Sequence, residues 1–445
     1  MSTATVRPFE VTHRGVLAIA IPMTLAYLST PLVGLVDTGV IGQLGDAALI
    51  GGIALGAVIF DIVFTTMNFL RSGTTGLTAQ AHGAQDRTEV DASFFRALIV
   101  AVAIGFAVLA LKDVILEVAL SLIGGSEAVQ TATRTYYGIR VLATPFALIN
   151  YVILGWLIGL NRAGLALVLQ TILNGVNIGL SLYLVLGLDY GVAGVGWASF
   201  AAEALTAAVG FFIAFGLIER MRMPHRGVIL DRGALIRMIA VNRDIMIRSF
   251  ALLFAFAFFT SQSAGHGDVV LAANQVLMTL FFVGSFFLDG MATAAEQLAG
   301  RSVGARYRPA FDRSLKLTVG WGFAIGFAAS LVFWIAGPAI IDAMTTNEAV
   351  RETARLYLPF AALTPLVGTL AFQMDGVFIG ATWSADMRNM MLLSLALYIA
   401  IWWVLTPLLG VSGLWIALLV FLGARGLSLL WRTRARAAMA FPGGR

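Results

Sequence analysis

The chain has 445 residues, of which 59% are hydrophobic and 12% charged, and its mean hydropathy is +0.89. No water-soluble domain hides so much apolar surface behind so few charges, so the composition predicts a protein that folds in lipid. The absence of cysteine excludes disulfides and thiolate metal sites, and the four scattered histidines argue against a metal centre. The net charge of +5 comes from arginines spread over short connections, which argues against a nucleic-acid-binding patch.

Apolar runs bounded by charged or Gly/Pro-rich breaks predict twelve membrane-spanning helices. A span needs roughly 20 apolar residues to cross about 30 Å of hydrocarbon, and a dozen such spans use almost the whole chain. The first run is too long and too interrupted by proline for a cleaved signal peptide. The expected spans are 15–41, 47–72, 92–122, 135–160, 164–188, 192–219, 243–264, 269–300, 314–341, 354–380, 389–409 and 411–431.

Arginine is concentrated in alternate connections, which predicts the orientation of these spans. With the N-terminus in the cytoplasm, most of the arginines in the connections and the basic C-terminal tail fall on the cytoplasmic side and the other side is nearly bare, so both termini are expected in the cytoplasm. The longest connection, residues 220–242, is strongly basic and is interpreted as a cytoplasmic linker lying against anionic headgroups. It would separate an N-terminal six-helix lobe, residues 1–219, from a C-terminal one, residues 243–445.

The two halves of the chain carry matching short motifs in the same order. The offset between the matched motifs is nearly constant along four spans, which favours an internal duplication over chance matches. Because six spans per copy is an even number, both copies enter the membrane in the same direction, as in two-lobed transporters that rock about a central cavity. The matched residues include Gly45 and Gly267, Gly83 and Gly304, Pro145 and Pro365, and Gly155 and Gly376.

Asp37 and Asp61 are the candidate carboxylates inside the first two predicted spans. A charge there costs about 2.5–3.5 kcal/mol, so each one needs a reason. Asp37 in the first span fits a group that binds a proton or cation on one side and releases it in another conformation, although a solvated position near the end of the span stays open. Asp61 in the second span fits either a similar group or a bond to a neighbouring helix. Pro22 and Pro31 interrupt the first span and permit a kink.

Uncharged polar side chains complete the candidate set of the first half. Asn177 and Ser181 are four residues apart and so share one helix face. Amides and hydroxyls also hold transmembrane helices together, so a packing role stays open for all of them. The candidates are Asn150, Asn174, Asn177, Ser181 and Ser199.

The second half offers a different polar set: Asp289, Glu296 and Gln297 in the eighth span and Asp375 in the tenth. The repeat offset places apolar Phe259 opposite Asp37. We therefore expect the two lobes to have diverged in function.

Four stretches of sequence resemble the DinF-like branch of the multidrug and toxic compound extrusion (MATE) family. They are VDTGVIGQLG at 36–45, FLRSGTTGLTAQAHGA at 69–84, LDGMATAAEQLAG at 288–300 and MDGVFIGATWSADMRNMM at 374–391. The resemblance implies an all-α fold of twelve helices in two pseudo-two-fold-related six-helix lobes around a central cavity. It also implies a monomer in the bacterial inner membrane that needs no cofactor and exports amphipathic, often cationic, small molecules in exchange for protons or sodium.

The resemblance further implies a cation site in the first lobe. The family pattern has an aspartate and a hinge proline in span 1, an Asn and an Asp four apart in span 5, and a hydroxyl in span 6. Asp37, Pro22, Asn177 and Ser199 match it, whereas Ser181 stands where the pattern has the second aspartate. One carboxylate fewer weakens an oxygen-rich sodium site, so we expect proton coupling through Asp37, with sodium open. Asp289, Glu296 and Asp375 fit family positions in the second lobe.

Two other functions compete with drug export. A flippase for lipid-linked precursors would need a basic cavity for pyrophosphate, whereas the predicted mid-membrane set is acidic and amide-rich. An intramembrane prenyl or glycosyl transferase would need paired carboxylates for magnesium or a histidine site, and the sequence has no such motif, so we expect no enzyme.

Overall fold

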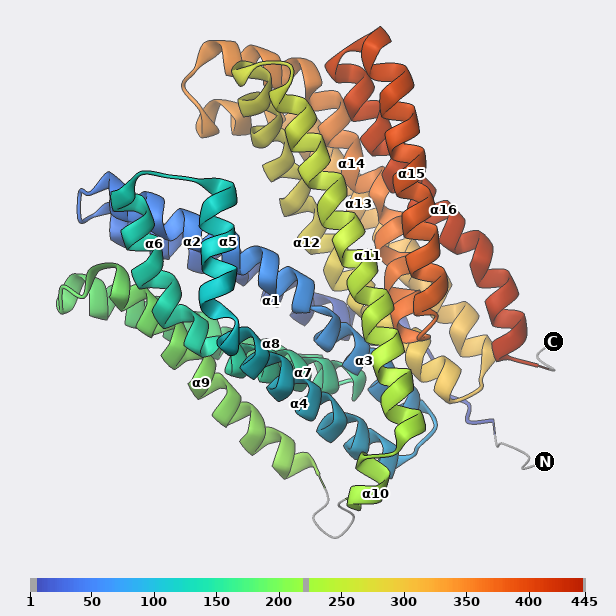
Figure 1. The fold of residues 1–445 in the computed structure, drawn as a ribbon. Helices are drawn as coiled ribbons and strands as arrows, with labels where there is room; N and C mark the ends of the chain where they lie inside the picture. Colours follow the sequence, from blue (N-terminus) through green and yellow to red (C-terminus); the bar gives the residue numbers. More distant parts are fainter. Residues whose placement is uncertain (1–5, 219–223, 443–445) are drawn as a thin grey trace. The chain divides into compact units, whose positions relative to one another are not determined.

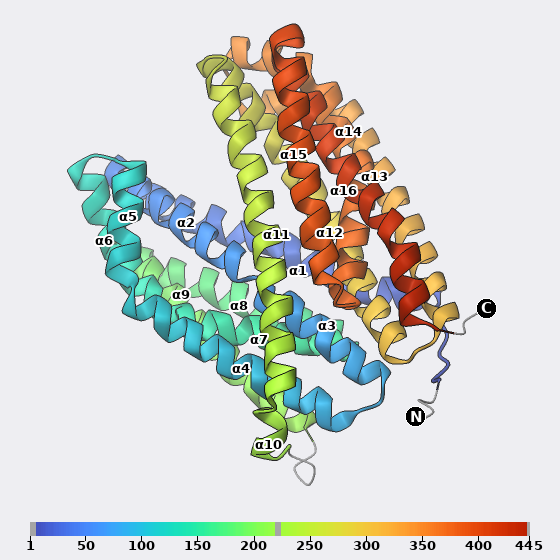
Figure 2. The ribbon, with the colours of Figure 1, turned by 45° about the vertical axis from the view of Figure 1, so that its right-hand side comes forward.

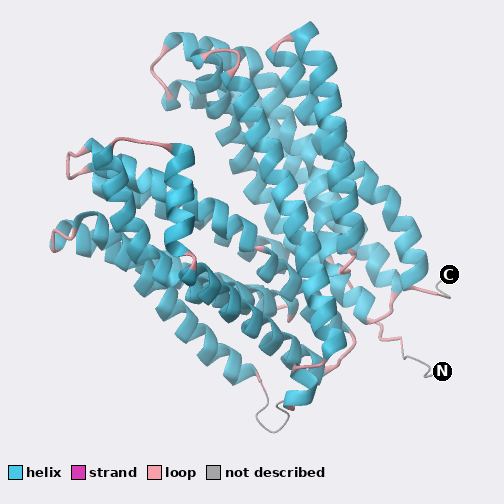
Figure 3. Cartoon of the chain, viewed as in Figure 1, coloured by secondary structure: helices cyan, strands magenta, loops and turns pink. Residues whose placement is uncertain are grey.

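The computed structural model describes residues 6–218 and 224–442, and within them the chain consists of helices and loops without a strand (Figure 3). Residues 219–223, where the predicted first lobe ends and the predicted linker begins, lie outside the described residues.

Twelve stretches of the described chain are long and apolar enough to cross a membrane, which confirms the predicted all-α, twelve-span fold. Several spans consist of two consecutive helices. The helices are α1 (His13–Gly42), α2 (Ala47–Met67), α3 (Phe69–Gly83), α4 (Arg87–Ala110), α5 (Lys112–Ile123), α6 (Glu127–Arg140), α7 (Thr144–Gly159), α8 (Ala163–Leu182), α9 (Gly191–Leu217), α10 (Arg226–Ile229), α11 (Arg232–Ala264), α12 (Asp268–Gly304), α13 (Arg308–Met344), α14 (Glu348–Gly380), α15 (Ser384–Leu409) and α16 (Val411–Ala440), with a 3-10 turn η1 (Val141–Ala143) and a π-helical turn η2 (Tyr183–Gly187).

The third, fourth and seventh predicted spans differ most from the structure, the seventh because α11 begins at Arg232, within the predicted linker, rather than at 243. The expected span 92–122 is divided at Leu111, so that α5 is a separate short helix that begins at Lys112. The fourth span begins at Glu127 rather than 135, because the Ser126 hydroxyl accepts a hydrogen bond from the backbone N–H of Val129 and caps α6. The start of α6 is therefore set by a capping residue, which hydropathy alone does not reveal.

The described helices gather into two compact units. The first-half unit consists of Leu25–Thr78 and Asp86–Met238, and the second-half unit consists of Met1–Thr24, Ala79–Gln85 and Ile239–Arg445. Helix α1 thus begins in one unit and ends in the other.

Within the first-half unit, α2 packs on α6, α4 on α7, and α8 on α9, while α9 also contacts α6 and α7 (Figure 1). Within the second-half unit, α14 is the central helix and contacts α12, α13, α15 and α16 (Figure 2). The buried core of each unit is formed by the apolar faces that these helix pairs share.

Equivalent glycines bring helices together at equivalent places in the two halves. A Cβ atom on Gly155 of α7 would collide with the backbone carbonyl of Arg71 in α3, and one on Gly376 of α14 would collide with that of Ala292 in α12. The step in sequence from Gly155 to Gly376 is the same as the step from Arg71 to Ala292. The duplication predicted from short motifs therefore reappears as a repeated close approach of two helices, which only glycine permits.

The ends of α3 and α12 contact each other reciprocally. Gly83 lies against the carbonyl of Arg301, and Gly304 lies against the carbonyl of Gln80. The two glycines are related by the repeat offset, and so are the two carbonyl-bearing residues. Such a reciprocal contact is what a two-fold relation between these helix ends produces.

Candidate functional site

Asp37 lies near the end of α1 with its side chain directed into the first-half unit. Its carboxylate accepts a hydrogen bond of 2.7 Å from the hydroxyl of Ser181 on α8, and the two residues are 5% and 0% exposed. Within the described part of the chain, this carboxylate forms no ion pair. A buried carboxylate with one neutral partner retains lone pairs for a proton or a cation.

Asn177 lies one helical turn before Ser181 on α8 and contacts the next helix, α9. Its amide Nδ2 donates to the hydroxyl of Ser199 on α9 at 3.0 Å, while its Oδ1 is buried without a hydrogen-bond partner among the described atoms. The spacing of four residues places Asn177 and Ser181 on one face of α8, as expected from the sequence. The site therefore combines a carboxylate with an unused amide oxygen, and both are acceptors.

The remaining amides form separate contacts. Asn174 donates to the hydroxyl of Ser29 on α1 at 2.7 Å. Asn150 on α7 donates to the carboxylate of Glu203 on α9 at 2.6 Å. These pairs tie neighbouring helices together and do not reach the carboxylate of Asp37.

A partly buried arginine that we did not predict lies within electrostatic reach of two carboxylates of the first-half unit. Arg140 ends α6; its guanidinium donates to the hydroxyl of Tyr136 and lies 4.7 Å from the ring centre of Phe60. It interacts electrostatically with Asp37 and with Asp61. Asp61 itself is exposed at the surface of α2, and Arg140 links it to the Asp37 site through charge.

Two charged residues of this unit, Arg140 and Glu203, escaped the prediction although both lie inside the expected spans 135–160 and 192–219. An ionisable residue within an apolar run is the signal that would have found them.

In the second-half unit, Asp375 lies in a cluster of charges. Its carboxylate pairs with Arg248 of α11 and, at 2.6 Å, with Arg425 of α16. Asp375 is 5% exposed and Arg425 is 2% exposed. Asp375 was predicted without either arginine, and in the structure its carboxylate joins α11, α14 and α16.

The other polar residues of the second-half unit lie on α12. Glu296 and Gln297 are buried, and both amide atoms of Gln297 lack a hydrogen-bond partner among the described residues. Asp289, two turns earlier, is partly buried and interacts electrostatically with Arg425. Within the described residues, no group of three or more His, Cys, Asp or Glu side chains is arranged to hold a metal ion.

Helix α1 belongs to one unit up to Thr24 and to the other unit from Leu25 onward. The division falls between Thr24 and Leu25, two residues after Pro22. α1 is continuous through both of its prolines, so the hinge role of Pro22 stays a prediction.

The family model MatE matches residues 22–183 and again residues 245–404. Each half of the chain thus matches the model once, which agrees with the duplication seen in the glycine contacts.

Curated relatives match nearly the whole chain. DNA damage-inducible protein F of Escherichia coli K12 is 38% identical over 432 residues, which cover 94% of this chain and 92% of that protein. A probable multidrug resistance protein NorM of Caulobacter vibrioides is 27% identical and covers 95% of this chain and 93% of its own length.

Solved structures show the same fold. An outward-facing multidrug resistance MATE family transporter superposes with a TM-score of 0.87 at 17% identity, covering 96% of each chain. A MATE structure in a bent conformation gives 0.87 at 19% identity, also covering 96% of each chain. With two family matches across the chain and a relative at 38% identity, the chain belongs to the MATE family and is a multi-pass membrane transporter, not an enzyme.

Proposed function

We propose that the protein is a secondary active antiporter that exports amphipathic, cationic small molecules in exchange for protons by alternating access. The observation that carries this proposal is the Asp37 carboxylate, buried in the first-half unit, bonded by the Ser181 hydroxyl and free of an ion pair among the described residues. A carboxylate in that setting takes up and releases one proton without breaking a salt bridge.

The oxygen ligands around Asp37 favour a proton over sodium. A hard cation takes several oxygen ligands, preferably charged ones. Here Ser181 supplies a hydroxyl in place of a second carboxylate, and the unused Oδ1 of Asn177 is a neutral ligand. One carboxylate and one amide oxygen are enough for a proton and few for a dehydrated sodium ion.

Arg140 fits the same scheme. Tyr136 and Phe60 hold its guanidinium in place, and its positive charge acts on both Asp37 and Asp61. When the proton leaves, this fixed cation would balance the negative charge that appears on Asp37. A cationic substrate would be drawn to the same carboxylates.

The change of access would use α1 as a hinge. The helix belongs to both units, and the division follows Pro22 by two residues, where the missing backbone donor makes bending easiest. The proposal includes two lobes, residues 1–219 and 243–445, joined by the linker 220–242. Both termini would be cytoplasmic, and the protein would be a monomer in a bacterial inner membrane. The Caulobacter relative is named a probable multidrug resistance protein, which supports the choice of substrate class.

Transport of ethidium, an amphipathic cation, by protein reconstituted in liposomes tests the proposal. An imposed pH gradient should drive ethidium transport by the native protein, and Asp37→Asn should reduce it to the level of protein-free liposomes. Asp189→Asn is the matched control, because Asp189 is an exposed loop residue with φ 54°, which Asn tolerates. Undiminished transport by Asp37→Asn would overturn the role of this residue, and transport driven by a sodium gradient at equal pH would overturn proton coupling.

A further inference from the structure

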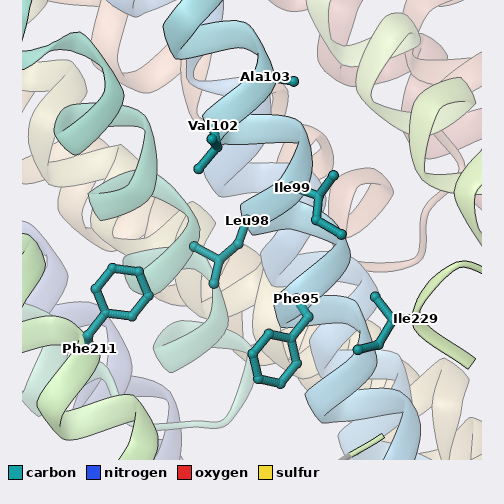
Figure 4. A pocket seen from close by; sticks show the side chains of 7 residues that line it. All are labelled: Phe95, Leu98, Ile99, Val102, Ala103, Phe211 and Ile229. Carbon is teal, nitrogen blue, oxygen red and sulfur yellow. The ribbon is translucent and has the colours of Figure 1, made fainter. Parts of the chain in front are cut away.

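An apolar groove lies on the first-half unit, and none of the residues of the polar site around Asp37 lines it. One face of α4 forms its floor, Phe211 of α9 forms one wall, and Ile229 of α10 closes one end (Figure 4). Its volume is about 460 Å³, within the roughly 300–1,000 Å³ typical of ligand pockets. Every lining residue is apolar: Phe95, Leu98, Ile99, Val102, Ala103, Phe211 and Ile229.

The length of the groove matches one leaflet of a bilayer. From Phe95 to Ala103 the helix rises about 12 Å, at 1.5 Å per residue. Half of a hydrocarbon core of about 30 Å is roughly 15 Å. A groove of this length and apolarity fits one acyl chain of a lipid whose headgroup lies at the α10 end.

The α10 end of the groove is held in place by a buried arginine. Arg96 of α4 is 2% exposed, pairs with Glu89 at 2.7 Å, and donates to the backbone carbonyls of Val228 at 2.8 Å and Ile229 at 3.0 Å. These carbonyls end α10, where backbone C=O groups lack partners within the helix, and the carbonyl of Val228 also accepts from the backbone N–H of Asp231 at 3.4 Å. The groove is therefore closed by a turn that Arg96 fixes, not by a loose loop.

The same end carries positive charge. Arg226 precedes Ile229 by three residues in α10, so the two side chains share one face of this turn. Arg226 is exposed, and so are Arg232 and Arg237 in the residues that follow. Exposed arginines beside an apolar groove at the membrane surface complement an anionic phospholipid headgroup.

We propose that this groove binds one anionic phospholipid, with an acyl chain along α4 and the phosphate beside Arg226. The lipid would hold the linker turn against α4. The inference is independent of the proposed transport activity and uses the proposed topology only to assign the leaflet as cytoplasmic.

Native mass spectrometry of the full-length protein in dodecyl maltoside, incubated with equal amounts of phosphatidylglycerol and phosphatidylcholine, tests the inference. We expect one retained phosphatidylglycerol on the native protein. Ala103→Trp fills the groove and should abolish retention, whereas Ala110→Trp, on the same helix and also exposed but outside the groove, should retain the lipid.

Arg226→Gln tests the headgroup contact without altering the packed core. Each such arginine contributes about 1 kcal/mol toward an anionic surface, so the ratio of bound phosphatidylglycerol to phosphatidylcholine should fall about five-fold. Arg434→Gln removes one exposed charge from α16 and should leave the ratio unchanged. Equal retention by the two tryptophan variants, equal binding of both lipids by the native protein, or binding of detergent alone would each overturn the proposal.

Discussion

The first-half and second-half units treat a buried carboxylate in opposite ways. Asp37 has a single hydroxyl partner at 2.7 Å, whereas Asp375 is held by two arginines from two different helices. Both lie in halves that share the same glycine contacts at equivalent positions of the repeat. Duplication thus preserved the backbone framework while the polar residues diverged, so that one carboxylate has a neutral hydroxyl partner and the other pairs with two arginines.

The largest effect on stability is expected from Asp375→Asn. The variant leaves Arg248 and Arg425 without their common anion, and breaking a buried ion pair costs about 3–5 kcal/mol. Thermal unfolding in detergent should show this loss, while Asp37→Asn, which breaks no ion pair among the described residues, should unfold close to the native temperature. Equal destabilisation by the two variants would remove the contrast between the units.

A second prediction concerns Ser181, the position that separates this chain from the family pattern. Ser181→Ala removes a hydrogen bond to a charged group, worth about 1.5–3 kcal/mol, so proton-driven ethidium transport should fall about ten-fold or more. Ser181→Asp adds a carboxylate beside Asp37 and should allow a sodium gradient to drive transport. If Ser181→Asp shows no response to sodium, the ion choice does not depend on this residue.

Because the two halves share the same glycine contacts, we expect similar losses of stability when equivalent glycines are replaced. Gly155→Ala and Gly376→Ala each push a methyl group into a backbone carbonyl, and overpacking costs about 1–3 kcal/mol. Gly175→Ala in α8 meets no atom within 4 Å and is the control. A loss at only one of the two glycines, measured by thermal unfolding, would show that the repeat contacts are not equivalent.

The smallest effect is expected at an exposed ion pair between α5 and α6. The guanidinium of Arg134 holds the pKa of Glu117 in α5 below its ordinary value. A lowered carboxyl pKa stabilises the fold above the ordinary pKa and loses that contribution as the pH falls through the lowered value. Because both side chains are exposed, Glu117→Gln should change thermal unfolding little at neutral pH and not at all in acid. A large loss at neutral pH would contradict this.

Most of the fold could be predicted because lipid leaves so few alternatives. Hydropathy and the short motifs placed all twelve spans and the repeat, since backbone groups in hydrocarbon must bond within a helix. The limits of α5 and α6 could not be read from hydropathy, because the side chain of Ser126 caps the start of α6 and a turn of the backbone at Leu111 separates α5 from α4.

The candidate site was predictable only in part. The four-residue spacing of Asn177 and Ser181 placed them on one face, and the family pattern pointed to Asp37 and Ser199. The partners Arg140, Glu203, Arg248 and Arg425 come from other helices, and no spacing along one helix reveals which side chains meet across a unit. Only the structure therefore shows which carboxylates pair with an arginine and which do not.

Proton release on substrate binding tests the central claim most directly. Purified protein in weakly buffered dodecyl maltoside is mixed with ethidium, and the released protons are counted with a pH indicator. The account predicts release by the native protein, release by Asp375→Asn to the extent that it stays folded, and none by Asp37→Asn. Undiminished release by folded Asp37→Asn would contradict the assignment of Asp37 as the proton carrier.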